Sequence, residues 1–329
     1  MPSRNLAQYL VVTLKGLAMG AADVVPGVSG GTIAFISGIY EELIATIHAI
    51  DLGFFKLWKQ NGFLAAWKHY NLGFLTALFL GVAISILSFA KLITWLLEFH
   101  PILVWSFFFG LVIASILFVG KQIARWNGKV IVALLLAAVF AYLITLAKPL
   151  GSMDSVWFLF FAGFIAIIAM ILPGISGAFI LLLLGAYQAI IGTLSDLGEG
   201  ISKANWDIFS QALLKICIFG LGAIVGIKVF SRVLNWMFKH HKNMILAVLT
   251  GFMIGALNKI WPWKEVLSYR TSHDGLQVPF IERSILPTQY TEDPQLLMAL
   301  VFIVLGFLSI FVLERIAVGK KKHHEIEEQ

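Results

Sequence analysis

Long apolar stretches recur along the chain and alternate with short polar segments. A helix needs about 20 apolar residues to cross the hydrocarbon core of a bilayer, which is about 30 Å thick. Two apolar stretches, 6–48 and 155–194, are each interrupted near the middle by a segment containing Pro and Gly. The uninterrupted stretches predict membrane-spanning helices over residues 72–97, 101–120, 130–147, 208–238, 243–261 and 296–318.

The two interruptions carry the same motif. Residues 26–44 read PGVSGGTIAFISGIYEELI, and residues 173–191 read PGISGAFILLLLGAYQAII, with identities at a constant offset of 147. Downstream the offset becomes 141, and identities continue at Gly81/Gly222, Phe89/Phe230, Trp95/Trp236, His100/His241 and Gly110/Gly251. We infer one ancestral unit that was duplicated, giving an N-terminal repeat over 1–150 and a C-terminal repeat over 151–329.

The composition supports a membrane protein and excludes several other classes. The chain is 59% hydrophobic and 13% charged, with a mean hydropathy of +0.89, which a soluble domain of 329 residues would not tolerate. Its single cysteine, Cys217, provides neither a disulfide nor a multi-cysteine metal site. We expect no metal, no cofactor and no nucleic-acid partner, and we attribute the net charge of +6 to anchoring at the cytoplasmic face.

The distribution of basic residues predicts the topology. Lys and Arg gather in four segments, 51–70, 121–129, 239–242 and 320–322. The positive-inside rule places these segments and both termini in the cytoplasm of a bacterial inner-membrane, multi-pass protein. Each repeat then has three spans and one interrupted segment, which crosses either zero times or twice. The number of crossings per repeat is therefore odd, so the two repeats must have inverted topology.

The fold predicted from this pattern is an all-α polytopic membrane protein with two inverted-topology repeats. Each repeat consists of an interrupted helical hairpin plus three transmembrane helices. We favour hairpins that re-enter on the same side, because no polar loop flanks either motif. Six full spans with two re-entrant hairpins and ten full spans both remain open at this point.

Each motif can build an anion site at mid-depth. Proline stops the incoming helix and glycine allows a tight turn, which predicts hairpin turns at Pro26, Gly27, Pro173 and Gly174. Ser29 and Ser176 are then N-caps of the outgoing half-helices. The first N–H groups of these half-helices, around Gly30, Gly31, Thr32 and Gly177, have no intrahelical acceptor and suit phosphate or carboxylate. The alternative is that Gly and Ser only permit tight packing.

Few ionisable residues lie within the apolar stretches. Lys91 and Arg232 occupy equivalent repeat positions, and we expect them to be charge partners of a bound anion, with snorkelling toward the headgroups as the alternative. Asp23 or Glu41 is the candidate for proton coupling, with an interfacial ion pair as the alternative. Any coupling carboxylate belongs to the N-terminal half, because the second half has Met170 and Gln188 at these positions.

The sequences GLAMGAADVVPGVSGGTIAFISGIYEELI, ILPGISGAFILLLLGAYQAI and GFMIGALNKIWPW closely resemble the bacterial polyprenyl-phosphate transporter family over essentially the whole chain. Where that family often has Ser, the third motif has Ala256. The resemblance implies a flippase, not an enzyme, that returns undecaprenyl phosphate from the outer to the cytoplasmic leaflet for reuse as a lipid carrier. The substrate region that it implies comprises Asp23, Pro26, Gly27, Ser29, Gly30, Gly31 and Thr32, with Pro173, Gly174, Ser176 and Gly177.

The residues and the resemblance agree on an anionic ligand, and we expect transport by alternating access. The expected partners are a polyprenyl phosphate, membrane lipids, a coupling proton or other ion, and a second copy of the chain in a homo-oligomer. A carrier or channel for a small soluble anion is the main alternative. An intramembrane serine hydrolase is a weaker one, because Gly27-Val28-Ser29-Gly30 matches a short G-x-S-G pattern but no histidine lies well inside an apolar span.

Overall fold

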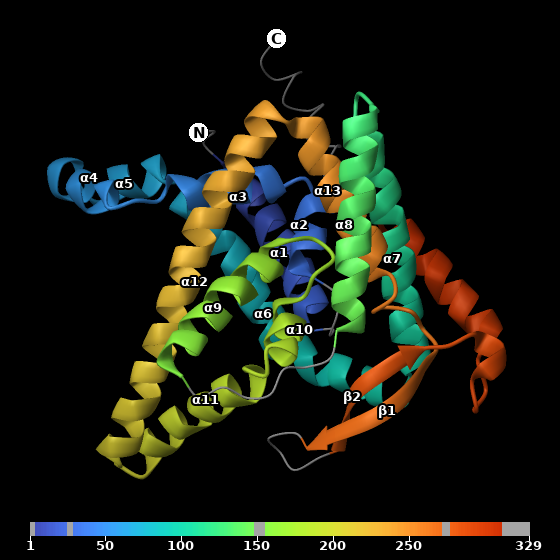
Figure 1. The fold of residues 1–329 in the computed structure, drawn as a ribbon. Coiled ribbons are helices and arrows are strands. Elements are labelled where there is room, and N and C mark those ends of the chain that lie inside the picture. Colours follow the sequence, from blue (N-terminus) through green and yellow to red (C-terminus); the bar gives the residue numbers. More distant parts are fainter. Residues whose placement is uncertain (1–3, 25–28, 148–154, 272–276, 311–329) are drawn as a thin grey trace.

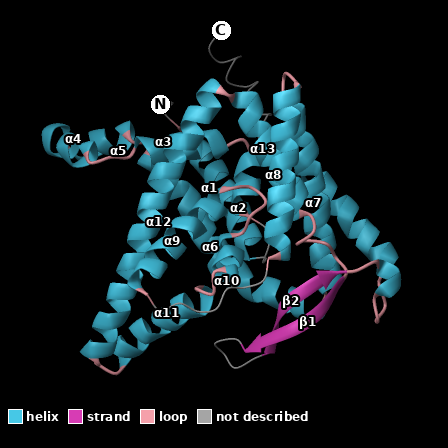
Figure 2. Cartoon of the chain, viewed as in Figure 1, coloured by secondary structure: helices cyan, strands magenta, loops and turns pink. Residues whose placement is uncertain are grey.

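The computed structural model describes residues 4–24, 29–147, 155–271 and 277–310, and these residues are mostly helical (Figure 2). The first half contains α1 (Leu6–Val24), α2 (Gly30–Ile36), α3 (Tyr40–Ala49), α4 (Gly53–Asn61), α5 (Phe63–His69), α6 (Leu72–Phe99), α7 (Pro101–Lys121) and α8 (Gly128–Leu146). The second half contains α9 (Val156–Ile171), α10 (Gly177–Leu183), α11 (Tyr187–Ser202), α12 (Trp206–His240), α13 (Lys242–Ala256), β1 (Lys264–Thr271), β2 (Gln277–Ser284), the 3-10 turn η1 (Pro287–Gln289) and a last helix over Leu296–Ile310.

Every uninterrupted apolar stretch forms a helix in the described part of the chain. Three helices, α7, α8 and α12, are long and apolar enough to cross a membrane, and α5 with the first part of α6 adds a fourth if this pair, bent by 75°, is one span. The segments Trp157–Ile171, Lys242–Ala256 and Leu296–Ile310 are shorter apolar helices. The prediction of a helical, polytopic chain is confirmed at this level.

Each interrupted stretch is broken twice. The first break is at the motif, between α1 and α2 or between α9 and α10. The second is at Gly38 and Gly185, whose φ angles of 71° and 74° lie in the left-handed region that glycine adopts at little cost. The bounds of α10 are those of α2 shifted by 147 residues, so the sequence repeat corresponds to a repeat of local structure. Pro26, Gly27 and the predicted boundary at residue 150 lie outside the described residues.

Glycines bring equivalent helices into close contact in the two halves. A Cβ at Gly81 would lie 2.0 Å from the carbonyl oxygen of Thr13 on α1, so α6 approaches α1 backbone to backbone. At the same repeat positions, a Cβ at Gly222 would lie 1.9 Å from the carbonyl oxygen of Phe160, so α12 approaches α9 in the same way. Each half is therefore built on one long helix in close contact with the first helix of its hairpin.

Basic segments gather at one end of the molecule. The α12–α13 junction contacts the start of α3 through an ion pair between Lys242 and Glu41 (2.7 Å), and it contacts the α7–α8 loop through a hydrogen bond from the Ala124 N–H to Asn243 (3.0 Å). At this end α4 and α5 project sideways from the bundle (Figure 1). They expose apolar side chains together with Lys56, Lys59 and Lys68.

A β-hairpin occupies the opposite end, at the lower right of Figure 1. Strands β1 and β2 pair antiparallel, with Lys264 opposite Ser284 and Val266 opposite Glu282. The sequence pattern predicted an all-α fold, so this sheet is a departure from the prediction. Trp261 and Trp263 fix the segment by donating indole N–H groups to the carbonyl oxygens of Ile285 (2.8 Å) and Pro294 (2.9 Å).

The close approach of α12 and α9 predicts a stability difference between two neighbouring glycines. Gly222→Ala places a methyl group against the backbone of Phe160, and we expect overpacking to cost about 1–3 kcal/mol. Gly220→Ala on the same helix meets nothing within 4 Å and should be neutral or slightly stabilising. Thermal unfolding of both variants in detergent measures the difference, and equal melting temperatures would contradict the close packing.

Candidate functional site

The two motifs meet in the middle of the molecule. The Ser29 hydroxyl donates to the carbonyl oxygens of Met170 (3.2 Å) and Leu172 (3.1 Å), at the end of α9. In return, the Gly174 N–H donates to the Thr32 hydroxyl (3.1 Å). Because the hairpins exchange hydrogen bonds, backbone groups that the interruption frees from a helix find partners within the protein.

Tight backbone turns allow this crossing. A Cβ at Gly31 would lie 2.4 Å from the carbonyl oxygen of Ile171, so only glycine lets α2 pass the end of α9 at this distance. Gly174 has a φ of 88°, which lies in the left-handed region that favours glycine. Ser29 is the N-cap of α2 and Ser176 the N-cap of α10, as the sequence predicted.

The first motif carries its own anion. The Asp23 carboxylate, on α1, accepts a hydrogen bond from the Gly30 N–H (2.7 Å) at the N-terminus of α2. The N–H groups of Gly31 and Thr32 bond to the hydroxyl (3.1 Å) and the carbonyl (2.9 Å) of Ser29. These N–H groups, expected to be available to phosphate, therefore have acceptors in this conformation.

A lysine lies at the other end of the same short helix. Lys15 on α1 donates from Nζ to the carbonyl oxygen of Ser37 (2.6 Å), the C-cap residue of α2. A cation is favourable at a helix C-terminus and an anion at an N-terminus, so Lys15 and Asp23 stabilise the two ends of α2.

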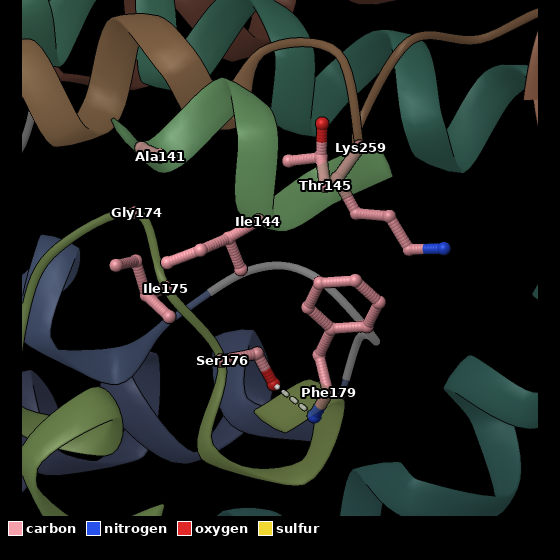
Figure 3. Close-up of a pocket in the computed structure, with 8 residues that line it drawn as sticks. All are labelled: Ala141, Ile144, Thr145, Gly174, Ile175, Ser176, Phe179 and Lys259. Carbon is pink, nitrogen blue, oxygen red and sulfur yellow. Dashed lines mark hydrogen bonds between the residues drawn. The ribbon is translucent and has the colours of Figure 1, made fainter. Parts of the chain in front are cut away.

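The second motif lines a small pocket that contains a lysine (Figure 3). Its lining comes from the turn and start of α10, from the end of α8 and from the segment after α13, and comprises Ala141, Ile144, Thr145, Gly174, Ile175, Ser176, Phe179 and Lys259. The Ser176 hydroxyl accepts from the Phe179 N–H (3.4 Å). The Lys259 ammonium group lies over the Phe179 ring, 4.9 Å from its centroid.

No carboxylate takes the place of Asp23 in the second half. Met170 stands at the equivalent repeat position, and its Cβ lies 3.1 Å from where a Cβ of Gly177 would be. Within the described residues, the N–H groups of Gly177 and Ala178 make no hydrogen bond. The second motif thus presents donors and a nearby cation, whereas the first motif is neutralised by Asp23.

Lys259 also belongs to a charged cluster at the base of the β-hairpin. Its Nζ donates to Glu282 Oε2 (3.2 Å), and Lys264 Nζ lies 3.6 Å from the same oxygen. Burial alone would raise the pKa of Glu282, but the ammonium groups of Lys264 and Lys259 hold it below its usual range. Lys259 therefore connects the pocket at the second motif to the β-hairpin.

Three further residues were predicted to take part in the site. Glu41 is in an exposed ion pair with Lys242 at the basic end, away from the motifs. Arg232 is exposed on α12, and Lys91 lies within α6. Their assignment to the site stays a prediction.

Sequence reasoning missed Lys259 and Lys228. Lys228 on α12 donates to the carbonyl oxygen of Ile47 (2.7 Å) near the C-terminus of α3, a role that gives no sequence signal. Lys259 had a signal, because it is the only charged residue in the GFMIGALNKIWPW segment.

Comparisons with known proteins agree with the motifs. A relative from Vibrio cholerae called "Polyprenyl-phosphate transporter" is 44% identical over 313 residues, covering 94% of this chain and 97% of the relative. A protein of the same name from Staphylococcus aureus is 32% identical over 261 residues, covering 76% of this chain and 85% of the relative. No solved structure matches the chain significantly.

The family model described as undecaprenyl phosphate translocase-like matches residues 19–278, which include both motifs, Lys259 and β1. The match covers most of the chain, and the two relatives support the same grouping. This protein belongs to the undecaprenyl phosphate translocase-like family.

Proposed function

We propose that the chain is a transporter that returns undecaprenyl phosphate from the outer to the cytoplasmic leaflet of the bacterial inner membrane. The observation that carries the proposal is the pocket at the second motif, which is lined by Ser176 and Lys259 and lies beside Gly177 and Ala178, whose N–H groups make no hydrogen bond within the described residues. A phosphate loses much of its hydration on entering a membrane, and these donors replace the lost water. The names of the relatives favour a polyprenyl phosphate as the cargo.

The second motif is the first binding position in this proposal. Ser176 donates its hydroxyl to the phosphate, Gly177 donates its N–H, and Lys259 supplies a positive charge. Lys259 bonds to Glu282 on β2. The β-hairpin lies at the end opposite the basic segments, and by the positive-inside rule we take this end to face the outside of the cell. The headgroup therefore enters from the outer leaflet while its apolar tail stays in lipid.

The first motif is the second binding position. Ser29, Gly30, Gly31 and Thr32 become available when the hairpins separate and Asp23 leaves the N-terminus of α2. Protonation of Asp23 removes the competing negative charge, which links proton movement to phosphate transfer. Asp23 fits this coupling role better than Glu41, because Asp23 contacts the motif directly.

Alternating access by two inverted repeats is the mechanism we propose. Equivalent helix pairs, α1 with α6 and α9 with α12, are locked by glycine contacts at matching positions. The α6–α7 junction lies at the β-hairpin end, where Trp105 contacts Lys264, whereas the equivalent α12–α13 junction lies at the basic end. Equivalent helix junctions of the two repeats thus lie at opposite ends of the molecule, which supports inverted topology of the repeats. The halves then rock relative to each other as the hydrogen bonds between the hairpins break and re-form.

The serine hydrolase alternative has no support from the site. The Ser29 side chain is buried, and its hydroxyl bonds to backbone groups of Met170, Leu172 and Gly31. A nucleophilic serine needs a general base within hydrogen-bond reach, and none of the bonds to Ser29 in the described residues comes from a histidine. The transporter names of the relatives agree with a role that is not enzymatic.

Leaflet exchange by purified protein in liposomes tests the function. We expect wild-type protein to exchange undecaprenyl phosphate, and Lys259→Met and Ser176→Ala each to slow exchange at least tenfold, because each removes a charge-assisted or hydroxyl donor worth about 1.5–3 kcal/mol. Lys203→Met is the matched control, because Lys203 is exposed at the end of α11 and is paired there with Glu199. Uptake of a soluble anion without lipid exchange would contradict the lipid substrate and favour a transporter for a small soluble anion.

Proton coupling is tested by an imposed pH gradient across the same liposomes. Asp23→Asn keeps a side-chain oxygen near the Gly30 N–H but removes the titrating group, so we expect exchange to lose its response to the gradient. Glu41→Gln disrupts only the exposed pair with Lys242 and should keep the response. A gradient response that survives in Asp23→Asn and disappears in Glu41→Gln would reverse the assignment.

A further inference from the structure

The charged cluster at the base of the β-hairpin has an excess of positive charge. Lys259 and Lys264 share one carboxylate, that of Glu282, at 3.2 and 3.6 Å. The nearest other pair on the hairpin, Arg283 with Glu265 at 2.6 Å, is exposed and internally balanced. Two cations around one anion leave the cluster short of one negative charge.

Lys264 is buried without the partners that a buried ammonium group needs. Its side chain is 7% exposed, and its Nζ atom makes no hydrogen bond within the described residues. The group lies over the face of Trp105, 3.4 Å from the ring centroid, which gives it a cation–π contact. Burial lowers the pKa of Lys264 to about 7 in spite of the attraction of Glu282, so Glu282 compensates this charge incompletely.

The cluster leads directly to the second motif. Lys259 takes part in both, because its Nζ bonds to Glu282 and lies over the ring of Phe179 on α10. Lys259 would contact an anion held between Lys259 and Lys264, and the same lysine lines the pocket that contains Ser176. Asn258 fixes the segment that carries Lys259. Its side-chain amide donates to the Thr145 hydroxyl at the end of α8 (2.8 Å), and its backbone carbonyl oxygen accepts from the Ser284 hydroxyl on β2 (2.9 Å).

We propose that Lys259 and Lys264 form an entry site for a phosphate monoester headgroup, in which Glu282 is an exchangeable counterion. Glu282 holds the two lysines together when the site is empty. An arriving phosphate carries more negative charge than a carboxylate and more acceptor oxygens, so it binds both lysines, and the Glu282 side chain turns away from them. Lys259 then passes the phosphate to the second motif. The inference rests on the proposed transport of a polyprenyl phosphate and adds the residues that select it.

The test is equilibrium binding of undecaprenyl phosphate to purified protein in nanodiscs, with matched variants on the same hairpin. Glu282→Gln removes the competing charge, so we expect binding about tenfold tighter. Lys264→Gln should weaken it about tenfold, and Lys264→Arg should retain it. Glu265→Gln, which makes the same charge change in the exposed pair, should leave affinity unchanged, as should Lys203→Gln.

The outcomes separate this inference from the proposed function. Wild-type protein that exchanges the lipid, with Glu282→Gln and Glu265→Gln equal in affinity, overturns the entry site and leaves the transport function intact. Wild-type protein that neither binds nor exchanges the lipid overturns the function. Inorganic phosphate is the second probe: binding to wild type that is lost in Lys264→Gln confirms the site and assigns it to soluble phosphate. Melting temperatures show whether each variant is folded, and a Lys264→Gln variant that is folded and binds normally also refutes the site.

Discussion

Backbone polar groups that leave a helix inside a bilayer must find partners within the protein, and this requirement organises the centre of the molecule. Each hairpin interrupts its helix at a motif, and each motif supplies partners to the other. The Ser29 hydroxyl bonds to carbonyl oxygens at the end of α9, and Thr32 accepts from the Gly174 N–H. All three bonds join side chains of the first hairpin to backbone groups of the second, so the second hairpin depends on the first for these partners. The contact that stabilises the centre of the fold is therefore also the contact that the proposed mechanism opens.

The two halves share a local helical framework but differ in their electrostatics. The framework is kept by glycines at matching positions, where any side chain would separate the helices. The charges differ: Asp23 occupies the N-terminus of α2, whereas Met170 stands in the same place beside α10. The second half instead receives Lys259 from a segment outside the repeat motif. One half therefore neutralises its own donors, and the other half leaves them open to a ligand.

Much of the helical framework could be predicted from the sequence, because apolar length, interrupting Pro and Gly, and an offset of 147 residues are local signals. The N-caps Ser29 and Ser176 follow from the same local chemistry. The contacts of Ser29 with α9 and of Lys259 with Phe179 join segments distant in sequence, so no periodicity encodes them. The β-hairpin was missed because its strands are short, polar and contain a proline, Pro279, opposite Tyr269. Lys91 and Arg232 were chosen for repeat symmetry, and their part in the site stays a prediction, whereas Lys259 has no counterpart in the repeat.

The charges at the two ends of α2 have a consequence for how this protein can change during evolution. Lys15 and Asp23 lie at opposite ends of a helix of seven residues, about 10 Å apart along its axis. Burying either charge alone is costly, whereas the two together leave the hairpin electrically neutral. The equivalent positions in the second half, Ala162 and Met170, carry no charge at all. The pair is therefore coupled: a lineage that lost one of these residues would be under pressure to lose the other, and the two positions should vary together.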